Sequence, residues 1–172
     1  INNSQFVGTN FSSADLSRGE FKNGNFQMAF LQRVDATNTN FENSNFSKAK
    51  LNNIILQNSN LKNANFTGVS FGNANLSKAS MINTIFSNAD LSMAFGLNQD
   101  QLNKACGNLN TRLPLGLIIP FCNGKDSTGD SQSSTKGIDQ AIRDVEVLLR
   151  ATGPKNRDIY KRLSRIRQEL LN

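Results

Sequence analysis

A five-residue period of apolar positions runs through the first half of the chain. From residue 1 to residue 91, every fifth residue is apolar without exception. The series is Ile1, Phe6, Phe11, Leu16, Phe21, Phe26, Leu31, Ala36, Phe41, Phe46, Leu51, Leu56, Leu61, Phe66, Phe71, Leu76, Met81, Phe86 and Leu91. A five-residue period fits neither the turn of an α-helix nor the alternation of a β-strand. It fits a chain that turns a corner every five residues and points one large side chain per segment inward. Such a repeat predicts a solenoid, in which each unit buries its apolar face against its neighbours.

A second register supports this interpretation. The residue two positions before each apolar centre is uncharged and mostly small, as at Ala14, Gly24 and Ala64. A position beside a bulky inward side chain must be small if the interior is to fill without clashes. The residue between the two is often Asn or Asp, as at Asn25 and Asp90. These side chains bond to nearby backbone groups and tolerate tight turns.

Two residue types also recur at intervals of twenty residues. One series is Phe6, Phe26, Phe46, Phe66 and Phe86, and an outward one is Asn3, Asn23, Asn43, Asn63 and Asn83. Four five-residue sides per coil would stack each series as a ladder of rings or amides, which stabilises stacked strands. Asparagine repetition alone could reflect low-complexity composition. The coincident phenylalanine series favours a four-sided coil.

These units resemble a known family. The segments 14–18 (Ala-Asp-Leu-Ser-Arg), 64–68 (Ala-Asn-Phe-Thr-Gly), 74–78 (Ala-Asn-Leu-Ser-Lys) and 89–93 (Ala-Asp-Leu-Ser-Met) resemble the A-(D/N)-(L/F)-x-x unit of pentapeptide-repeat proteins. The resemblance covers about residues 1–95. It implies an all-β solenoid, the right-handed quadrilateral β-helix of that family.

A second resemblance follows the repeats. The pattern A-C-G…T-x-L-P-x-G-L…P-x-C is similar to a tail found in a subset of bacterial members of the family. It matches at Ala105, Cys106, Gly107, Thr111, Leu113, Pro114, Gly116, Leu117, Pro120 and Cys122. This resemblance implies a bacterial origin.

The chain divides into four parts: repeat β-helix at 1–96, capping helix and cysteine-bounded loop at 97–122, linker at 123–137, and helical tail at 138–172. Residues 97–107 indicate a short helix with Asn98 as N-cap, Asp100 in the first turn and Gly107 at the stop. Such a helix would cover the last coil, whose bare edge otherwise invites association.

The tail carries two amphipathic stripes. The residues expected to make contacts are Ile142, Val145 and Leu149 in the first and Ile159, Leu163, Ile166 and Leu170 in the second. Two helices of this size cannot bury their stripes against each other alone and remain stable. We therefore expect them to pack on the β-helix, on a second copy or on a partner.

Cys106 and Cys122 flank one proline-punctuated loop outside the repeat. A disulfide between them would close a loop of about sixteen residues and contribute roughly 3 kcal/mol. It would imply an oxidising compartment, and we favour the bacterial periplasm or secretion over the cytoplasm. The alternative is two buried free thiols in a cytosolic protein.

Composition argues against catalysis. The chain has no histidine, so the common acid–base and nucleophilic arrangements lack their parts. Two thiols without histidine also leave a metal site incomplete, and we expect no cofactor.

The formal net charge is +6. The resemblance to pentapeptide-repeat proteins also implies an alternative function, because some of them imitate the shape and acidity of B-DNA and modulate type II topoisomerases such as gyrase. That function requires a strongly negative surface, so the positive net charge disfavours it.

The remaining class is a non-enzymatic protein-interaction or structural scaffold. Outward apolar residues mark candidate contacts, at Phe30, Ile55, Ile85 and Phe95. We expect a protein partner, a homodimer or both, in preference to nucleic acid or a peripheral membrane contact. No run of apolar residues is long enough to span a membrane.

Overall fold

The computed structural model describes residues 1–122 and 165–166 of the 172-residue chain. The chain separates into two compact units, Ile1–Asn123 and Gly124–Asn172. Within the described residues, the one regular helix longer than two residues is α1 (Gln99–Leu102), and every β-interaction is an isolated bridge. The linker and almost all of the predicted helical tail therefore lie outside the described residues.

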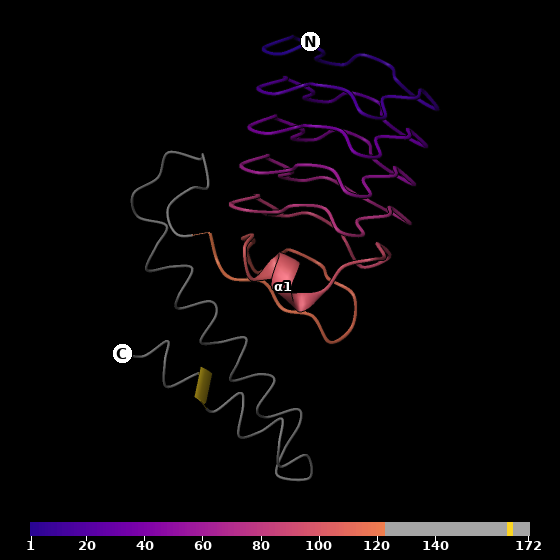
Figure 1. Cartoon of the computed structure of the whole chain (residues 1–172). Coiled ribbons are helices and arrows are strands. Elements are labelled where there is room, and N and C mark those ends of the chain that lie inside the picture. Colours follow the sequence, from indigo (N-terminus) through magenta and orange to yellow (C-terminus); the bar gives the residue numbers. More distant parts are fainter. Residues whose placement is uncertain (123–164, 167–172) are drawn as a thin grey trace, which may run out of the picture. The chain divides into compact units, whose positions relative to one another are not determined.

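Residues 1–95 wind into a stack of coils, drawn from indigo to pink in Figure 1. Every fifth residue forms a parallel bridge to the residue twenty positions later, beginning with Gln5 to Asn25 and Asn10 to Phe30. One coil is therefore four five-residue sides, which confirms the twenty-residue period. Each bridge consists of two backbone hydrogen bonds to the preceding coil: Asn25 N–H donates to the Ser4 carbonyl (2.9 Å), and the Asn25 carbonyl accepts from Phe6 N–H (2.7 Å).

The corners depend on left-handed backbone. Most sides end with a residue of positive φ, such as Asn23 (59°), Asn43 (60°) and Asn63 (57°). Asparagine is tolerated in this conformation because its short polar side chain bonds locally. The asparagine-rich sequence is therefore a requirement of the turns.

The predicted ring ladder fills the interior. Phe26 and Phe46 stack with centroids 4.8 Å apart and planes 7° apart, and Phe46 and Phe66 repeat this at 4.8 Å and 11°. Phe21 and Phe41 form a second stack at 5.5 Å. All of these rings except Phe21 have no solvent exposure. The core is a continuous column that runs along the axis of the coil.

The small inward positions are tightly constrained. A Cβ atom built on Gly24 would lie 2.7 Å from the Phe26 ring and 2.9 Å from the Phe21 carbonyl oxygen. The carbonyl cannot move without disturbing the corner, because it also accepts hydrogen bonds from Gly24 N–H and from the Ser44 hydroxyl.

We expect Gly24→Val to lower the free energy of unfolding by about 2 kcal/mol, the range of overpacked cores. Urea denaturation followed by far-ultraviolet circular dichroism measures it. Gly68→Val is the comparison variant: its Cβ position is open and its cost comes from the φ of 71°, whereas Gly24 has no positive φ and its cost comes from the clash. An unchanged midpoint for Gly24→Val would contradict the packing account.

The outward asparagines form the predicted amide ladder. The Nδ2 atom of each donates to Oδ1 of the preceding one: Asn23 to Asn3 (2.8 Å), Asn43 to Asn23 (2.9 Å), Asn63 to Asn43 (2.8 Å) and Asn83 to Asn63 (3.2 Å). The ladder links five successive coils along one corner. It therefore supplements the backbone bridges between coils.

Asn43→Ala should cost about 1 kcal/mol more stability than Asn53→Ala. Both residues have φ near 60°, so both substitutions remove the same conformational tolerance, but Asn53 stands outside the amide ladder. Parallel urea melts measure the difference. Equal losses would show that the side-chain amide bonds contribute nothing beyond the turn.

The end of the stack differs from the prediction. The expected helix over 97–107 is confined to α1, which has Asn98 as N-cap and Asp100 in its first turn, as predicted. Gly107 was wrongly assigned as the helix stop. The chain leaves the helix early because 104–112 returns to the coil edge: Cys106 pairs with Ile85, Arg112 pairs with Asp90, and Gly107 pairs with Phe121. Pairing the open edge with backbone satisfies more groups than a longer helix would.

Leu102 of α1 is fully buried, and Ala105 is buried. The Gln101 side-chain amide donates to the carbonyls of Leu76 (2.9 Å) and Ala79 (3.0 Å). The first unit thus ends in a short helix and a partial coil on the last repeats (Figure 1).

Candidate interaction surface

The interior of the solenoid carries no reactive group among the described residues. The buried polar side chains are Thr39, Ser44, Ser59, Thr84 and Ser87. Ser44 donates to the Phe21 carbonyl (2.8 Å), Thr39 to Leu16 (2.8 Å), Thr84 to Leu61 (2.8 Å) and Ser59 to Leu56 (2.7 Å). Each of these hydroxyls is therefore used in a structural hydrogen bond to a backbone carbonyl. Any functional chemistry of the described unit must therefore lie on its outer faces.

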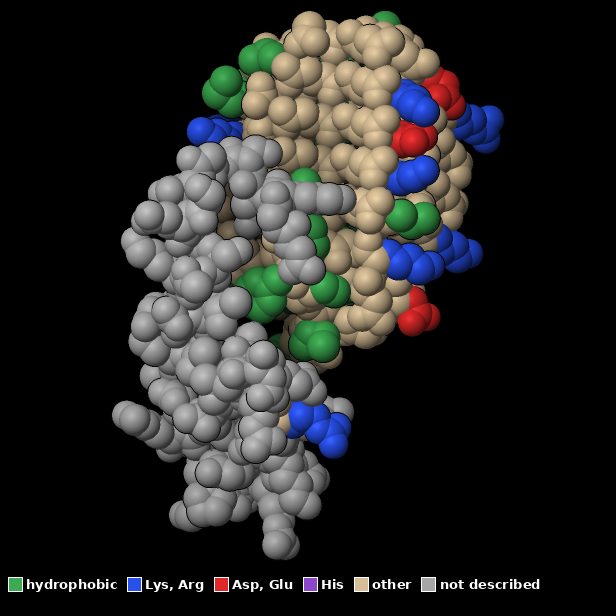
Figure 2. All heavy atoms as spheres, turned by 90° about the vertical axis from the view of Figure 1, so that its left-hand side faces the viewer, with side chains coloured by type: hydrophobic (Ala, Val, Ile, Leu, Met, Phe, Trp, Pro, Cys, Tyr) green, Lys and Arg blue, Asp and Glu red, His purple; other side chains and the backbone are tan. Residues whose placement is uncertain are grey.

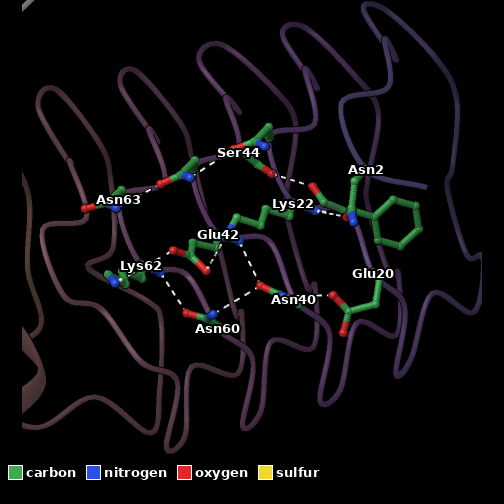
Figure 3. A network of polar contacts seen from close by, with 12 residues as sticks. Asn2, Glu20, Lys22, Asn40, Glu42, Ser44, Asn60, Lys62 and Asn63 are labelled. Atoms are coloured by element: carbon green, nitrogen blue, oxygen red, sulfur yellow. Dashed lines mark hydrogen bonds and ion pairs between the residues drawn. The ribbon is translucent and has the colours of Figure 1, made fainter.

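Charged side chains on one outer face neutralise one another. Glu42 lies between two lysines, with carboxylate oxygens 3.3 Å from Lys22 Nζ and 3.7 Å from Lys62 Nζ. Figure 3 shows this row beside the amide ladder. Beside it, the Asn40 amide donates to Glu20 (2.8 Å) and the Asn60 amide to Asn40 (3.1 Å). Exposed pairs of this kind contribute little stability, and the alternation leaves no field of one sign.

Two carboxylates on a neighbouring face serve the turns. Asp15 and Asp35 stack as a bridge pair, and each Oδ1 accepts a backbone N–H two residues later, from Ser17 (2.8 Å) and Thr37 (2.9 Å). The Ser17 hydroxyl and amide hydrogen bonds lower the pKa of Asp15. Among the described residues no group of three or more His, Cys, Asp or Glu side chains is placed to hold a metal ion.

Asp90 makes the same turn near the end of the stack. Its Oδ1 accepts from the Ser92 hydroxyl (2.6 Å) and from Ser92 N–H (3.0 Å), and these bonds lower its pKa, with a smaller contribution from Arg112. A lowered pKa means that the ionised form is favoured in the folded state.

The turn at Asp90 should therefore be more stable above the ordinary pKa of an aspartate, and this contribution should disappear as pH falls through the lowered pKa. Carboxyl ¹³C NMR titration measures the pKa directly. Ser92→Ala should move the pKa of Asp90 up toward its ordinary value. A titration that is identical in both proteins would refute the assignment.

Three of the four predicted outward residues are exposed on the solenoid. The exposed fractions are 37% for Phe30, 38% for Ile55 and 54% for Phe95. Ile85 is half-buried, because it bridges both Asn65 and Cys106. Ile55 and Phe95 lie in one column of bridges, separated by Asn75, and Phe30 lies on another face with Lys50 Nζ 5.1 Å from its ring centroid. The structure therefore does not bring the predicted residues into one patch.

Sequence analysis missed other exposed apolar side chains. They are Val7, Met28, Ile82, Met93, Leu109, Leu115, Ile118 and Phe121. Several belong to the segment after the repeats, and Figure 2 shows apolar side chains on one face at that end of the stack. For Leu115, Ile118 and Phe121 the signal was the uncharged run at 113–121, which was interpreted only as a proline-punctuated loop.

The remaining predicted site residues are the two cysteines and the apolar residues of the tail, and only some of them lie within the described residues. The Sγ atoms of Cys106 and Cys122 lie 2.02 Å apart, as a disulfide. In the tail, Ile166 is exposed and helical. Ile142, Val145, Leu149, Ile159, Leu163 and Leu170 lie outside the described residues. No helix among the described residues is long and apolar enough to cross a membrane.

Comparison with known proteins identifies relatives of the repeat region. Residues 4–81 match the family model described as a pentapeptide repeat region. No curated protein matches the sequence significantly.

Among solved structures, a pentapeptide repeat protein from the Arabidopsis thaliana thylakoid lumen is 26% identical, with a TM-score of 0.47; the match covers 58% of this chain and 72% of that one. A pentapeptide repeat protein from Nostoc PCC 7120 is 18% identical, with a TM-score of 0.50, and covers 63% of this chain and 84% of that one. The plasmid-mediated fluoroquinolone resistance protein QnrB1 is 20% identical, with a TM-score of 0.35, and the match covers 70% of this chain and 79% of that one.

The family match lies within the coils that the bridges define, and the Nostoc structure shares their fold. Residues 4–81 thus match a pentapeptide repeat region, and the fold is a right-handed β-helix solenoid.

Proposed function

We propose that this protein is a non-enzymatic interaction scaffold that binds a protein partner, a second copy of itself, or both. The observation that carries the proposal is a rigid solenoid with an apolar-filled interior and exposed apolar side chains on separate outer faces. Pentapeptide repeat proteins are generally non-enzymatic interaction proteins, which supports the same conclusion.

The predicted helical tail is the proposed self-association or partner-binding element. Its two apolar stripes need a surface to cover them. The exposed solenoid residues Phe30, Ile55 and Phe95 are further candidate contacts.

Sedimentation velocity on the full chain tests the tail. We expect a dimer or larger species, and we expect the tail variant Leu149→Asp/Leu163→Asp to shift it to a monomer. The matched control, Val7→Asp/Met28→Asp, places the same charges on exposed solenoid positions and should leave the mass unchanged. A monomeric wild-type protein would reject self-association, and the tail would then be assigned to a different partner.

The alternative function, a DNA-mimic topoisomerase modulator, is disfavoured by the alternation of acidic and basic side chains on the outer face that carries Glu42. Mimicry of phosphates requires continuous acidic rows, but Glu42 is flanked by Lys22 and Lys62. Supercoiling by gyrase with added protein tests this directly, and inhibition at stoichiometric amounts would restore the alternative.

We further propose an oxidising compartment, the bacterial periplasm or the extracellular space. The disulfide supports this, because such bonds persist mainly outside the cytosol. Intact-mass analysis of protein purified from its source under alkylating conditions tests it. Two alkylated cysteines would reject the assignment.

A further inference from the structure

The segment after the repeats contains an uninterrupted apolar loop. Residues 113–121, here called the apolar loop, are Leu-Pro-Leu-Gly-Leu-Ile-Ile-Pro-Phe, and none has a side chain that ionises or forms a hydrogen bond. The loop has two sides. Leu113 and Ile119 pack against the core of the solenoid, whereas Leu115, Ile118 and Phe121 are 104%, 72% and 50% exposed. Soluble surfaces carry single apolar residues commonly, but a cluster of this kind marks a contact.

The loop is held in place at its base and along one side. The disulfide joins Cys122 to Cys106, Gly107 N–H donates to the Pro120 carbonyl (2.8 Å), and Cys122 N–H donates to the Gly107 carbonyl (3.0 Å).

Farther along the loop, the Gln99 side chain bonds both backbone groups of Ile118, at 3.1 Å to its N–H and 2.9 Å to its carbonyl. The backbone of the loop is thus held at Ile118, Pro120 and Cys122, which reduces the backbone entropy lost when the loop binds.

The composition of the loop fits lipid better than protein. Protein interfaces carry about one hydrogen bond per 100–200 Å² and favour Tyr, Trp and Arg as anchors. The apolar loop offers no side-chain donor or acceptor over its whole length. Its two prolines also lack an N–H, so fewer backbone donors lose water when the tip is buried. Lipid acyl chains form no hydrogen bonds, so burying these side chains among them leaves no side-chain hydrogen bond unsatisfied.

The charge around the loop is nearly balanced. Arg112 directly precedes the loop and is exposed, as is Lys104, but the Arg112 guanidinium lies 3.7 Å from the Asp90 carboxylate, and Asp100 is exposed on α1. Attraction to anionic headgroups therefore adds little, and the apolar side chains must supply most of the affinity.

We propose that the apolar loop is a membrane-surface anchor, inserting Leu115 and Ile118 shallowly into the interfacial layer of a lipid bilayer. This contact is independent of the proposed protein partner. It revises the sequence-based expectation, which placed a peripheral membrane contact behind a protein partner.

Flotation of the full-length protein with phosphatidylcholine vesicles tests the proposal. A second set of vesicles also contains phosphatidylglycerol, an anionic lipid that reveals any attraction to surface charge. The wild-type protein should float with both vesicle types. Leu115→Gln/Ile118→Gln should lower the partition coefficient by roughly tenfold or more, because two large aliphatic side chains no longer leave water. Both residues are exposed, so the substitutions leave the core unchanged.

The matched control is Met28→Gln/Ile82→Gln, which removes two exposed apolar side chains from the solenoid. It should partition like the wild type. The proposal is overturned if the wild-type protein stays with the lipid-free fraction, if the loop variant floats as well as the wild type, or if the control loses as much. Binding that requires phosphatidylglycerol and is unaffected by the loop variant would assign the contact to basic residues elsewhere.

Discussion

Phe46→Ala should lower the free energy of unfolding by about 4 kcal/mol, within the range of buried phenylalanine truncations. Phe46 has no solvent exposure and touches rings on three sides. It stacks on Phe26 and on Phe66, each at 4.8 Å, and meets Phe41 edge to face at 5.0 Å. A cavity at this level cannot collapse easily, because the coils above and below are fixed by backbone bridges.

Urea denaturation monitored by circular dichroism measures the effect. Phe30→Ala is the matched control, since it removes the same side chain from an outward position and should cost under about 1 kcal/mol. Equal losses in the two variants would contradict a core formed by the ring column. Solenoids unfold in sections when their repeats uncouple, so a broadened transition in Phe46→Ala would point to separation of the stack at this coil.

Removing the disulfide should be the second large effect. Cys106→Ser/Cys122→Ser should lower the free energy of unfolding by about 3 kcal/mol, the value for a closed loop of about this length. The bond spans a sequence separation of 16 residues and joins two paired segments within the first unit: Cys106 pairs with Ile85, and Cys122 follows Phe121, which pairs with Gly107.

As a control, the free energy of unfolding of both proteins is also measured in the presence of a reductant. The wild-type protein should lose the same stability in reductant, and the double variant should not respond to it. Hydrogen exchange at Phe86 N–H, which donates to the Cys106 carbonyl (2.8 Å), reports the local effect. A double variant as stable as the wild type would show that the backbone pairs at 104–112 hold this end without the bond.

Much of the fold could be predicted because the repeat is local. The position of each large and small residue is set within five residues, and the stacking partner is always twenty residues away, as at Phe26 and Phe46. The amide ladder follows from the same arithmetic. Over residues 1–95, the spacing of the repeat already identifies which residues contact one another between coils.

The end of the stack could not be predicted in the same way. Asn98 marks a helix start correctly, but the helix ends at Leu102 because the next residues pair with Ile85 and Asp90. The helix signals in a short segment carry no information about the unpaired backbone of the last coil, and pairing with that backbone competes with helix formation. The partial burial of Ile85 could not be predicted for the same reason, since Cys106, twenty-one residues later, pairs with it.

By itself, the sequence determined the coil: its period, its corners, its filled interior and the absence of histidine-based chemistry. These follow from composition and spacing, which local sterics convert directly into structure. Tertiary structure alone decided which apolar residues remain in water. Leu113 and Leu115 differ by two positions and look equivalent in sequence, yet one packs on the core and the other is fully exposed. The difference arises because the fold of 104–122 back onto the last coil sets which side of the loop meets protein and which meets solvent.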